Sequence, residues 1–89
     1  MYETREHCIK RLRMRAWRRG IREMDLILGG YADAHLAQLD GDALALFEAA
    51  LGEADHDLYE WVTGRSAAPD RYAPLMAALA EGVGPAPYR

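Results

Sequence analysis

The spacing of apolar residues predicts helices along almost the whole chain. Apolar side chains return every three or four positions, the period of one helix face, and no segment alternates as a strand would. Five helices are predicted, at residues 4–16, 20–39, 40–51, 55–63 and 70–81. The strongest pattern is that of 20–39, where one side of the helical wheel carries the residues expected to face the core: Ile21, Met24, Ile27, Leu28, Tyr31, His35 and Leu39. We expect His35 to be a hydrogen-bonded residue of the core and not a ligand. The sequence therefore predicts an all-α fold, a small bundle of about five helices.

Capping residues and glycines mark the expected helix ends. Side chains that can accept a hydrogen bond from a first helical turn begin four of the segments: Thr4, Asp40, Asp55 and Asp70. Gly52 and Gly64 follow two of the helices, a common position for glycine. The pair Gly29-Gly30 interrupts the longest pattern at a cost of about 2 kcal/mol in helix propensity. It predicts a kink, a break into two helices or a close crossing by another helix.

The stretch from Arg15 to Asp25 places a glycine among charged side chains. Gly20 either opens the second helix or leaves its surface bare for a close approach. If Gly20 is helical, Arg19 and Glu23 are neighbours four residues apart, in the weaker orientation for an ion pair. We therefore interpret this stretch as a docking patch. The candidate partner-binding residues are Arg19, Gly20 and Glu23, flanked by Arg18 and Asp25.

Trp17 lies at the expected junction between the first two helices. A tryptophan there serves either as an anchor between helices or as a contact for a partner. In both cases its indole N–H needs an acceptor.

Composition indicates one small globular domain. The chain has 89 residues, of which 51% are apolar, enough for a core but not for a deep enclosed pocket. We expect one helical domain at residues 1–83 and a flexible tail at 84–89, which is rich in Gly and Pro. The single cysteine, Cys8, cannot form an internal disulfide. With no segment typical of a signal peptide or a membrane span, we expect a cytoplasmic monomer without membrane insertion.

The net charge of −3 is distributed unevenly. Residues 1–23 hold eight Lys or Arg and three Glu, whereas residues 24–89 hold three Arg and eleven Asp or Glu. Such asymmetry favours an oriented approach to a partner. The basic side chains of 4–16 can equally form a solvated helix face. The alternative functions are a basic-faced domain that binds nucleic acid and a generic protein-interaction module. Because the basic residues are spread around the helix and the rest of the chain is acidic, we expect no nucleic-acid partner.

Motifs for catalysis or for metal binding are missing. One Cys and three scattered His cannot assemble a zinc site, and no P-loop Lys follows Gly29-Gly30. The adjacent His7 and Cys8 point to different sides of a helix, which does not suit a Cys–His pair. We therefore expect no catalytic residue, no metal and no cofactor bound by the chain itself, and we predict that the protein is not an enzyme.

Two motifs carry a resemblance to a known family. RRGIREMD resembles the Arg-Gly-x-x-Glu signature of the SdhE/YgfY-type succinate dehydrogenase assembly factors, and DHDLYEWVTG is similar to the family's Asp-x-Asp-Leu-(Tyr/Phe)-x-Trp segment. The two together, in a chain of this size, are quite specific, and the resemblance covers about residues 9–80.

The resemblance implies an assembly chaperone for a flavoprotein. The partner would be the flavoprotein subunit of succinate dehydrogenase, or of fumarate reductase in some bacteria, and FAD would be the cofactor of that client. Arg19, Gly20 and Glu23 would lie at the client interface. Gly20→Arg or Glu23→Ala would then abolish client flavinylation and leave the melting of the domain nearly unchanged.

Overall fold

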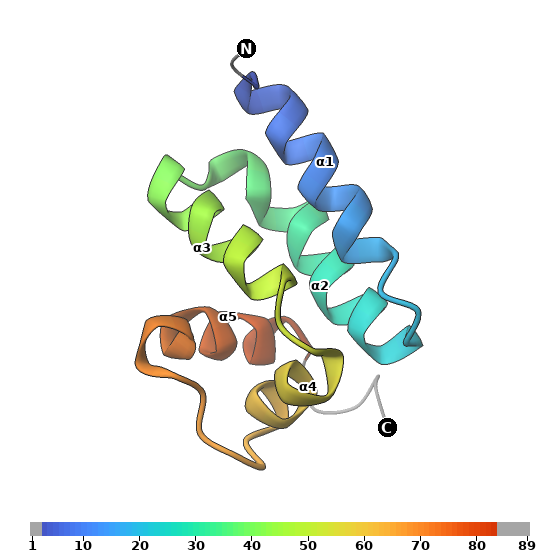
Figure 1. Ribbon diagram of the computed structural model, residues 1–89, viewed down its shortest axis with the longest axis vertical. Coiled ribbons are helices and arrows are strands. Elements are labelled where there is room, and N and C mark those ends of the chain that lie inside the picture. The colour runs from blue at the N-terminus through green and yellow to red at the C-terminus, as the bar shows by residue number, and fades with distance from the viewer. Residues whose placement is uncertain (1–2, 84–89) are drawn as a thin grey trace.

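The computed structural model describes residues 3–83, and these form a compact arrangement of helices (Figure 1). The α-helices are α1 (Arg5–Trp17), α2 (Arg22–His35), α3 (Gly41–Leu51), α4 (Asp55–Thr63) and α5 (Ala73–Val83). Short 3-10 turns, η1 (Leu36–Gln38) and η2 (Asp70–Tyr72), precede α3 and α5. No strand occurs among the described residues. The predicted all-α bundle of about five helices is confirmed.

Helices α1 and α2 form an antiparallel hairpin, and α3 lies beside it (Figure 1). Helices α4 and α5 pack against each other at the far end, and α5 also contacts α2. One apolar core joins all five helices, because each contributes buried side chains, among them Leu12, Leu28, Phe47, Leu58 and Leu79. A chain of this size has little interior to spare, so functional side chains must lie at its surface.

The Gly29-Gly30 pair does not break α2, which is continuous from Arg22 to His35. Of the three expectations for the pair, close crossing is the one realised. The Trp17 indole lies directly on Gly29, since a Cβ built at Gly29 would stand 2.2 Å from Cδ2 of Trp17. The indole Nε1–H donates to Asp33 Oδ2 on α2 at 3.2 Å. Trp17 is therefore an anchor between α1 and α2, with 38% of its surface still exposed.

Three expectations about helix ends and one about the core need correction. Asp70 is not an N-cap, because Pro69 occupies that position before η2 and makes no side-chain cap bond. The second helix begins at Arg22 and not at residue 20, so Ile21 lies outside the helix and is 44% exposed. Asp55 does not cap α4; Ala54 occupies the N-cap position and makes no side-chain cap bond. At the other end of α2, His35 is exposed beside Tyr31 and does not join the core. Thr4 and Asp40 cap α1 and α3 as predicted, accepting from His7 N and Ala43 N.

The expected flexible tail, residues 84–89, lies outside the described part of the chain. Over residues 3–83, no helix has the length and apolar character needed to cross a membrane.

Candidate functional site

The α1–α2 corner (residues 17–23) is an exposed turn with an open glycine at its centre. Gly20 has a φ of +91°, a conformation that side-chain-bearing residues rarely adopt. A Cβ built on Gly20 meets no atom within 4 Å. Gly20 is thus not helical. Arg19 lies before the start of α2, so Arg19 and Glu23 are not neighbours on one helix. The backbone at Gly20 is nevertheless open to a close approach.

Arg19 points into the domain and not toward solvent. Its Nε donates to Asp55 Oδ1 at 2.7 Å, and its Nη2 donates to the Glu53 carbonyl at 2.7 Å. Nη1 donates to the carbonyl of Leu51, the last residue of α3. Only 12% of the Arg19 side chain is exposed. Arg19 therefore satisfies a free carbonyl at the end of α3 and ties the corner to the α3–α4 connection.

Asp25 is engaged in the same turn. Its Oδ1 accepts the backbone N–H of Arg19 at 2.7 Å, and its own N–H donates to the Ile21 carbonyl at 2.9 Å. Asp25 thus contacts the chain on both sides of Gly20, Arg19 through its carboxylate and Ile21 through its backbone N–H. The sequence predicted that Arg19 and Asp25 bind a partner. In the structure the guanidinium of Arg19 and the carboxylate of Asp25 form internal hydrogen bonds that hold this turn.

The other candidates face water. Arg18 and Glu23 are exposed, and within residues 3–83 neither side chain forms an ion pair or a hydrogen bond. Ile21 was expected on the buried face of the second helix. It is exposed instead, because α2 begins one residue later, at Arg22. Ile21 and the exposed edge of Trp17 are contact residues that the sequence pattern did not identify. Arg22 is exposed as well and has no ion pair among the described residues. The corner therefore combines apolar surface with two positive charges, Arg18 and Arg22, and one negative charge, Glu23, none of them paired within residues 3–83.

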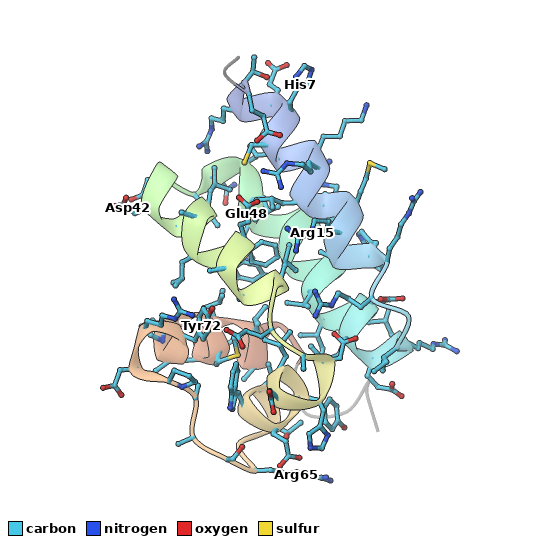
Figure 2. All side chains as sticks on the ribbon, in the orientation of Figure 1. His7, Arg15, Asp42, Glu48, Arg65 and Tyr72 are labelled. Carbon is cyan, nitrogen blue, oxygen red and sulfur yellow. The ribbon has the colours of Figure 1, made fainter. Side chains whose placement is uncertain are left out.

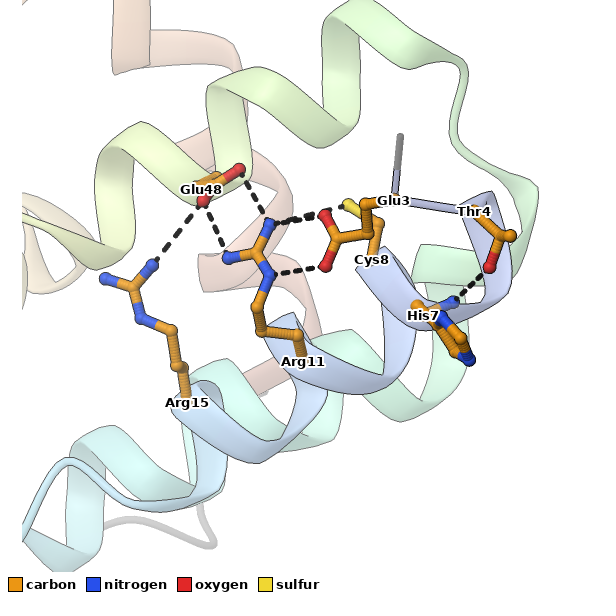
Figure 3. A network of polar contacts seen from close by, with 7 residues as sticks. All are labelled: Glu3, Thr4, His7, Cys8, Arg11, Arg15 and Glu48. Carbon is orange, nitrogen blue, oxygen red and sulfur yellow. Dashed lines mark hydrogen bonds and ion pairs between the residues drawn. The ribbon is translucent and has the colours of Figure 1, made fainter. Parts of the chain in front are cut away.

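Most basic side chains of α1 are paired within the domain. Arg11 binds Glu48 of α3 at 2.7 Å and Glu3 at 2.7 Å (Figure 3). These bonds to Arg11 hold the pKa of both carboxyl groups below its usual value. Arg13 Nε lies 3.1 Å from Asp33, and Arg15 lies 3.8 Å from Glu48. With Arg19 also paired, four of the seven basic residues between Lys10 and Arg22 have acidic neighbours, which weakens the case for a nucleic-acid surface.

The second motif builds the opposite side of the same junction. Asp55 forms the ion pair with Arg19, and Leu58 of α4 is fully buried. Trp61 is partly buried and stacks on Tyr72, with 5.9 Å between ring centroids. The Tyr72 hydroxyl donates to Glu53 Oε2 at 3.0 Å. The motif thus joins α4 to α5 and presents Asp55 to the corner.

Within the described residues, no group of three or more His, Cys, Asp or Glu side chains is placed to hold a metal ion. The site offers apolar contact and charge complementarity, which are means of binding another protein.

Comparison with known proteins agrees with the two motifs. Residues 10–83 match the model of the family described as flavinator of succinate dehydrogenase (Sdh5). Proteins named succinate dehydrogenase assembly factor 2, mitochondrial, are similar: that of Schizosaccharomyces japonicus is 37% identical over 70 residues, covering 79% of this chain and 49% of the relative. That of Schizosaccharomyces pombe is 32% identical over 71 residues, covering 80% and 51%. The chain spans about half the length of these relatives. The chain therefore belongs to the succinate dehydrogenase flavinator family, whose two recognisable motifs meet here at the ion pair between Arg19 and Asp55.

Proposed function

We propose that this protein binds the flavoprotein subunit of succinate dehydrogenase through the α1–α2 corner and promotes covalent attachment of FAD to it. The flavoprotein subunit of fumarate reductase is a second client of the same kind. The observation that carries the proposal is the corner itself: an open glycine on a turn fixed from inside by Arg19 and Asp25. Arg18, Arg22 and Glu23 surround it, and none of the three is paired within residues 3–83.

A fixed turn suits this role because binding then orders few groups. Rigid contact surfaces lose little conformational entropy on association. The backbone of a client can approach Gly20 closely, while Arg18 and Glu23 form charge-assisted hydrogen bonds at its edges, each worth about 1.5–3 kcal/mol where water is excluded. Ile21 adds apolar area, which contributes about 25 cal/mol per Å² removed from water.

The chain would act by positioning and not by supplying a catalytic group. Holding two reactants in productive geometry can lower a barrier by up to about 7–11 kcal/mol. We infer that the corner stabilises the arrangement of client domains in which the client's own histidine faces its bound FAD. FAD is accordingly the cofactor of the client, and we expect this chain alone not to quench the fluorescence of free flavin.

The test is co-production of the client with wild-type protein or a variant, followed by in-gel flavin fluorescence of the denatured client. Glu23→Ala should reduce client fluorescence severalfold without changing the melting temperature, because Glu23 has no internal partner in residues 3–83. Glu81→Ala, an exposed glutamate of α5, is the matched control and should flavinylate normally.

Two outcomes would count against the proposal. If Glu23→Ala flavinylates the client as well as Glu81→Ala does, the corner is not the client surface. If the wild-type protein leaves client fluorescence unchanged, the flavinylation function itself is wrong for this chain. The cytoplasmic location remains a prediction, since the curated relatives are named mitochondrial.

A further inference from the structure

A groove of about 790 Å³ lies between one face of α1 and the α3–α4 connection. Its α1 wall is formed by side chains three or four residues apart, which places them on one helix face: His7, Lys10, Arg11, Met14, Arg15 and Arg18. The opposite wall is the segment from Glu53 to Asp55, and Arg19 closes the end nearest the α1–α2 corner.

The acidic wall of the groove is already neutralised. Asp55 is paired with Arg19 at 2.7 Å. Glu53 Oε2 accepts from the Tyr72 hydroxyl at 3.0 Å and from Arg71 at 3.5 Å. Neither carboxylate is therefore available to offset a further positive charge in the groove.

The basic wall carries positive charges that are not paired with an acidic residue within residues 3–83. Arg15 is paired with Glu48 at 3.8 Å, whereas Lys10 and Arg18 are exposed and have no ion pair within residues 3–83. Met14, which lies between them along the helix, is 45% exposed and supplies an apolar surface. The groove thus has an unmatched positive charge and one flexible apolar contact, a surface that can adapt to an irregular chain.

We infer that this groove receives an acidic, extended peptide segment of the client flavoprotein, with its carboxylates on Lys10 and Arg18 and an apolar side chain on Met14. The identity of the partner rests on the proposed function; the chemistry of the segment rests on the charges of the groove. Arg18 belongs to both the groove and the α1–α2 corner, so one client would cover both surfaces.

Two other occupants fit less well. An isoalloxazine ring is commonly held between aromatic side chains, and none of the described lining residues is Phe, Tyr or Trp. A nucleic-acid backbone would need more free cations than the groove offers, because Arg11 and Arg19 of its lining are already paired with acidic residues. An extended peptide can direct its acidic side chains to one wall only.

The first test is the affinity for purified client flavoprotein at low and high salt. Lys10→Glu should weaken binding by about fivefold or more at low salt, with the difference shrinking toward about 0.5 M salt as the charges are screened. Arg65→Glu, the same change in charge on the α4–α5 connection far from α1 (Figure 2), should bind within about twofold of wild type. Thermal melting of each variant verifies that the fold is retained.

The second test replaces Met14 with a photoreactive p-benzoylphenylalanine and identifies the crosslinked client segment by mass spectrometry. We expect one segment rich in Asp and Glu, and no crosslink from the same group placed at the exposed Ala67. Equal binding by Lys10→Glu and Arg65→Glu, or a crosslinked segment without acidic residues, overturns the groove while leaving the proposed function in place. A wild-type chain that neither binds nor flavinylates the client overturns both.

Discussion

Arg19 and Asp55, 36 positions apart in the sequence, are joined by a 2.7 Å hydrogen bond between Nε and Oδ1. Their side chains are only 12% and 15% exposed. Each residue belongs to one of the two motifs typical of the family, so the motifs meet in one structural junction. The junction ties the α1–α2 corner to the loop between α3 and α4, so we expect the shape of each motif to depend on the other.

We predict that Arg19→Ala destabilises the domain by about 3 kcal/mol, because it leaves a mostly buried Asp55 carboxylate and two carbonyls without their donor. Arg19→Lys should recover only part of this loss, since one ammonium group cannot span three acceptors as a guanidinium does. Urea unfolding followed by circular dichroism measures both values.

Asp55→Asn is the companion variant for this junction. It removes the charge but leaves both carbonyl acceptors of Arg19, so we expect a smaller loss than for Arg19→Ala. An Arg19→Ala protein as stable as the wild type would show that Arg19 is free for a partner after all, and would return it to the client interface.

Gly20 should resist substitution for conformational reasons. Its φ of +91° disfavours any L side chain, so Gly20→Ala should cost about 1–2 kcal/mol even though nothing crowds a Cβ at that position. Gly20→Asn should cost less, because asparagine tolerates positive φ better. The free energies of unfolding of the two variants measure this difference.

The positive φ of Gly20 also changes the result expected for a Gly20→Arg variant. The sequence alone suggested that Gly20→Arg would leave melting nearly unchanged, but the strained φ predicts a lower melting temperature as well as loss of docking. Flavinylation by the better tolerated Gly20→Asn is the clearer measurement. Equal stability of wild type, Gly20→Ala and Gly20→Asn would contradict the role given to φ.

The sequence predicted the helices well and the corner only in part. Periodicity locates α1, α3 and α4 to within a residue or two, and Thr4 and Asp40 mark the starts of α1 and α3, because apolar spacing and caps are local signals. The prediction that Ile21 lies on the buried face of the second helix was wrong. The apolar pattern begins at Ile21, but the chain still turns there and α2 starts at Arg22. The inward direction of Arg19 depends on acceptors more than thirty residues away, which no local pattern encodes.

The two adjacent glycines of α2 should respond in opposite directions to alanine. Gly29→Ala would place a methyl group 2.2 Å from the Trp17 ring, so we expect a loss of about 1–3 kcal/mol as the ring is displaced. Gly30→Ala meets no atom within 4 Å and should stabilise the helix by up to about 1 kcal/mol. Urea unfolding of Gly29→Ala and Gly30→Ala measures the difference between their free energies of unfolding.

Trp17 fluorescence provides an independent readout for the same pair. Gly29→Ala should change the emission of Trp17, because the indole must leave Gly29 and lengthen its 3.2 Å bond to Asp33. Measurement in a Trp61→Phe background isolates this signal. If Gly29→Ala and Gly30→Ala are equally stable, the packing of Trp17 on α2 differs from that described.

Alkaline pH should destabilise the domain through Tyr72. Burial, followed by the hydrogen bond to Glu53, raises the pKa of Tyr72 above its usual value of 10.0. The unfolded chain then releases this proton at lower pH than the folded chain does. The stabilisation is therefore complete below about pH 10 and is lost as the pH rises through the folded-state pKa.

Tyr72→Phe should remove this part of the pH dependence. At neutral pH the variant loses about 1 kcal/mol with its hydrogen bond, yet its free energy of unfolding should fall less steeply than that of wild type above about pH 10. Glu53→Gln should keep most of the decline, because burial is the larger cause of the raised pKa. Tyr31, whose pKa burial also raises, would account for decline that remains in Tyr72→Phe. Parallel curves for wild type and Tyr72→Phe in urea unfolding from neutral to alkaline pH would exclude Tyr72 as the group responsible.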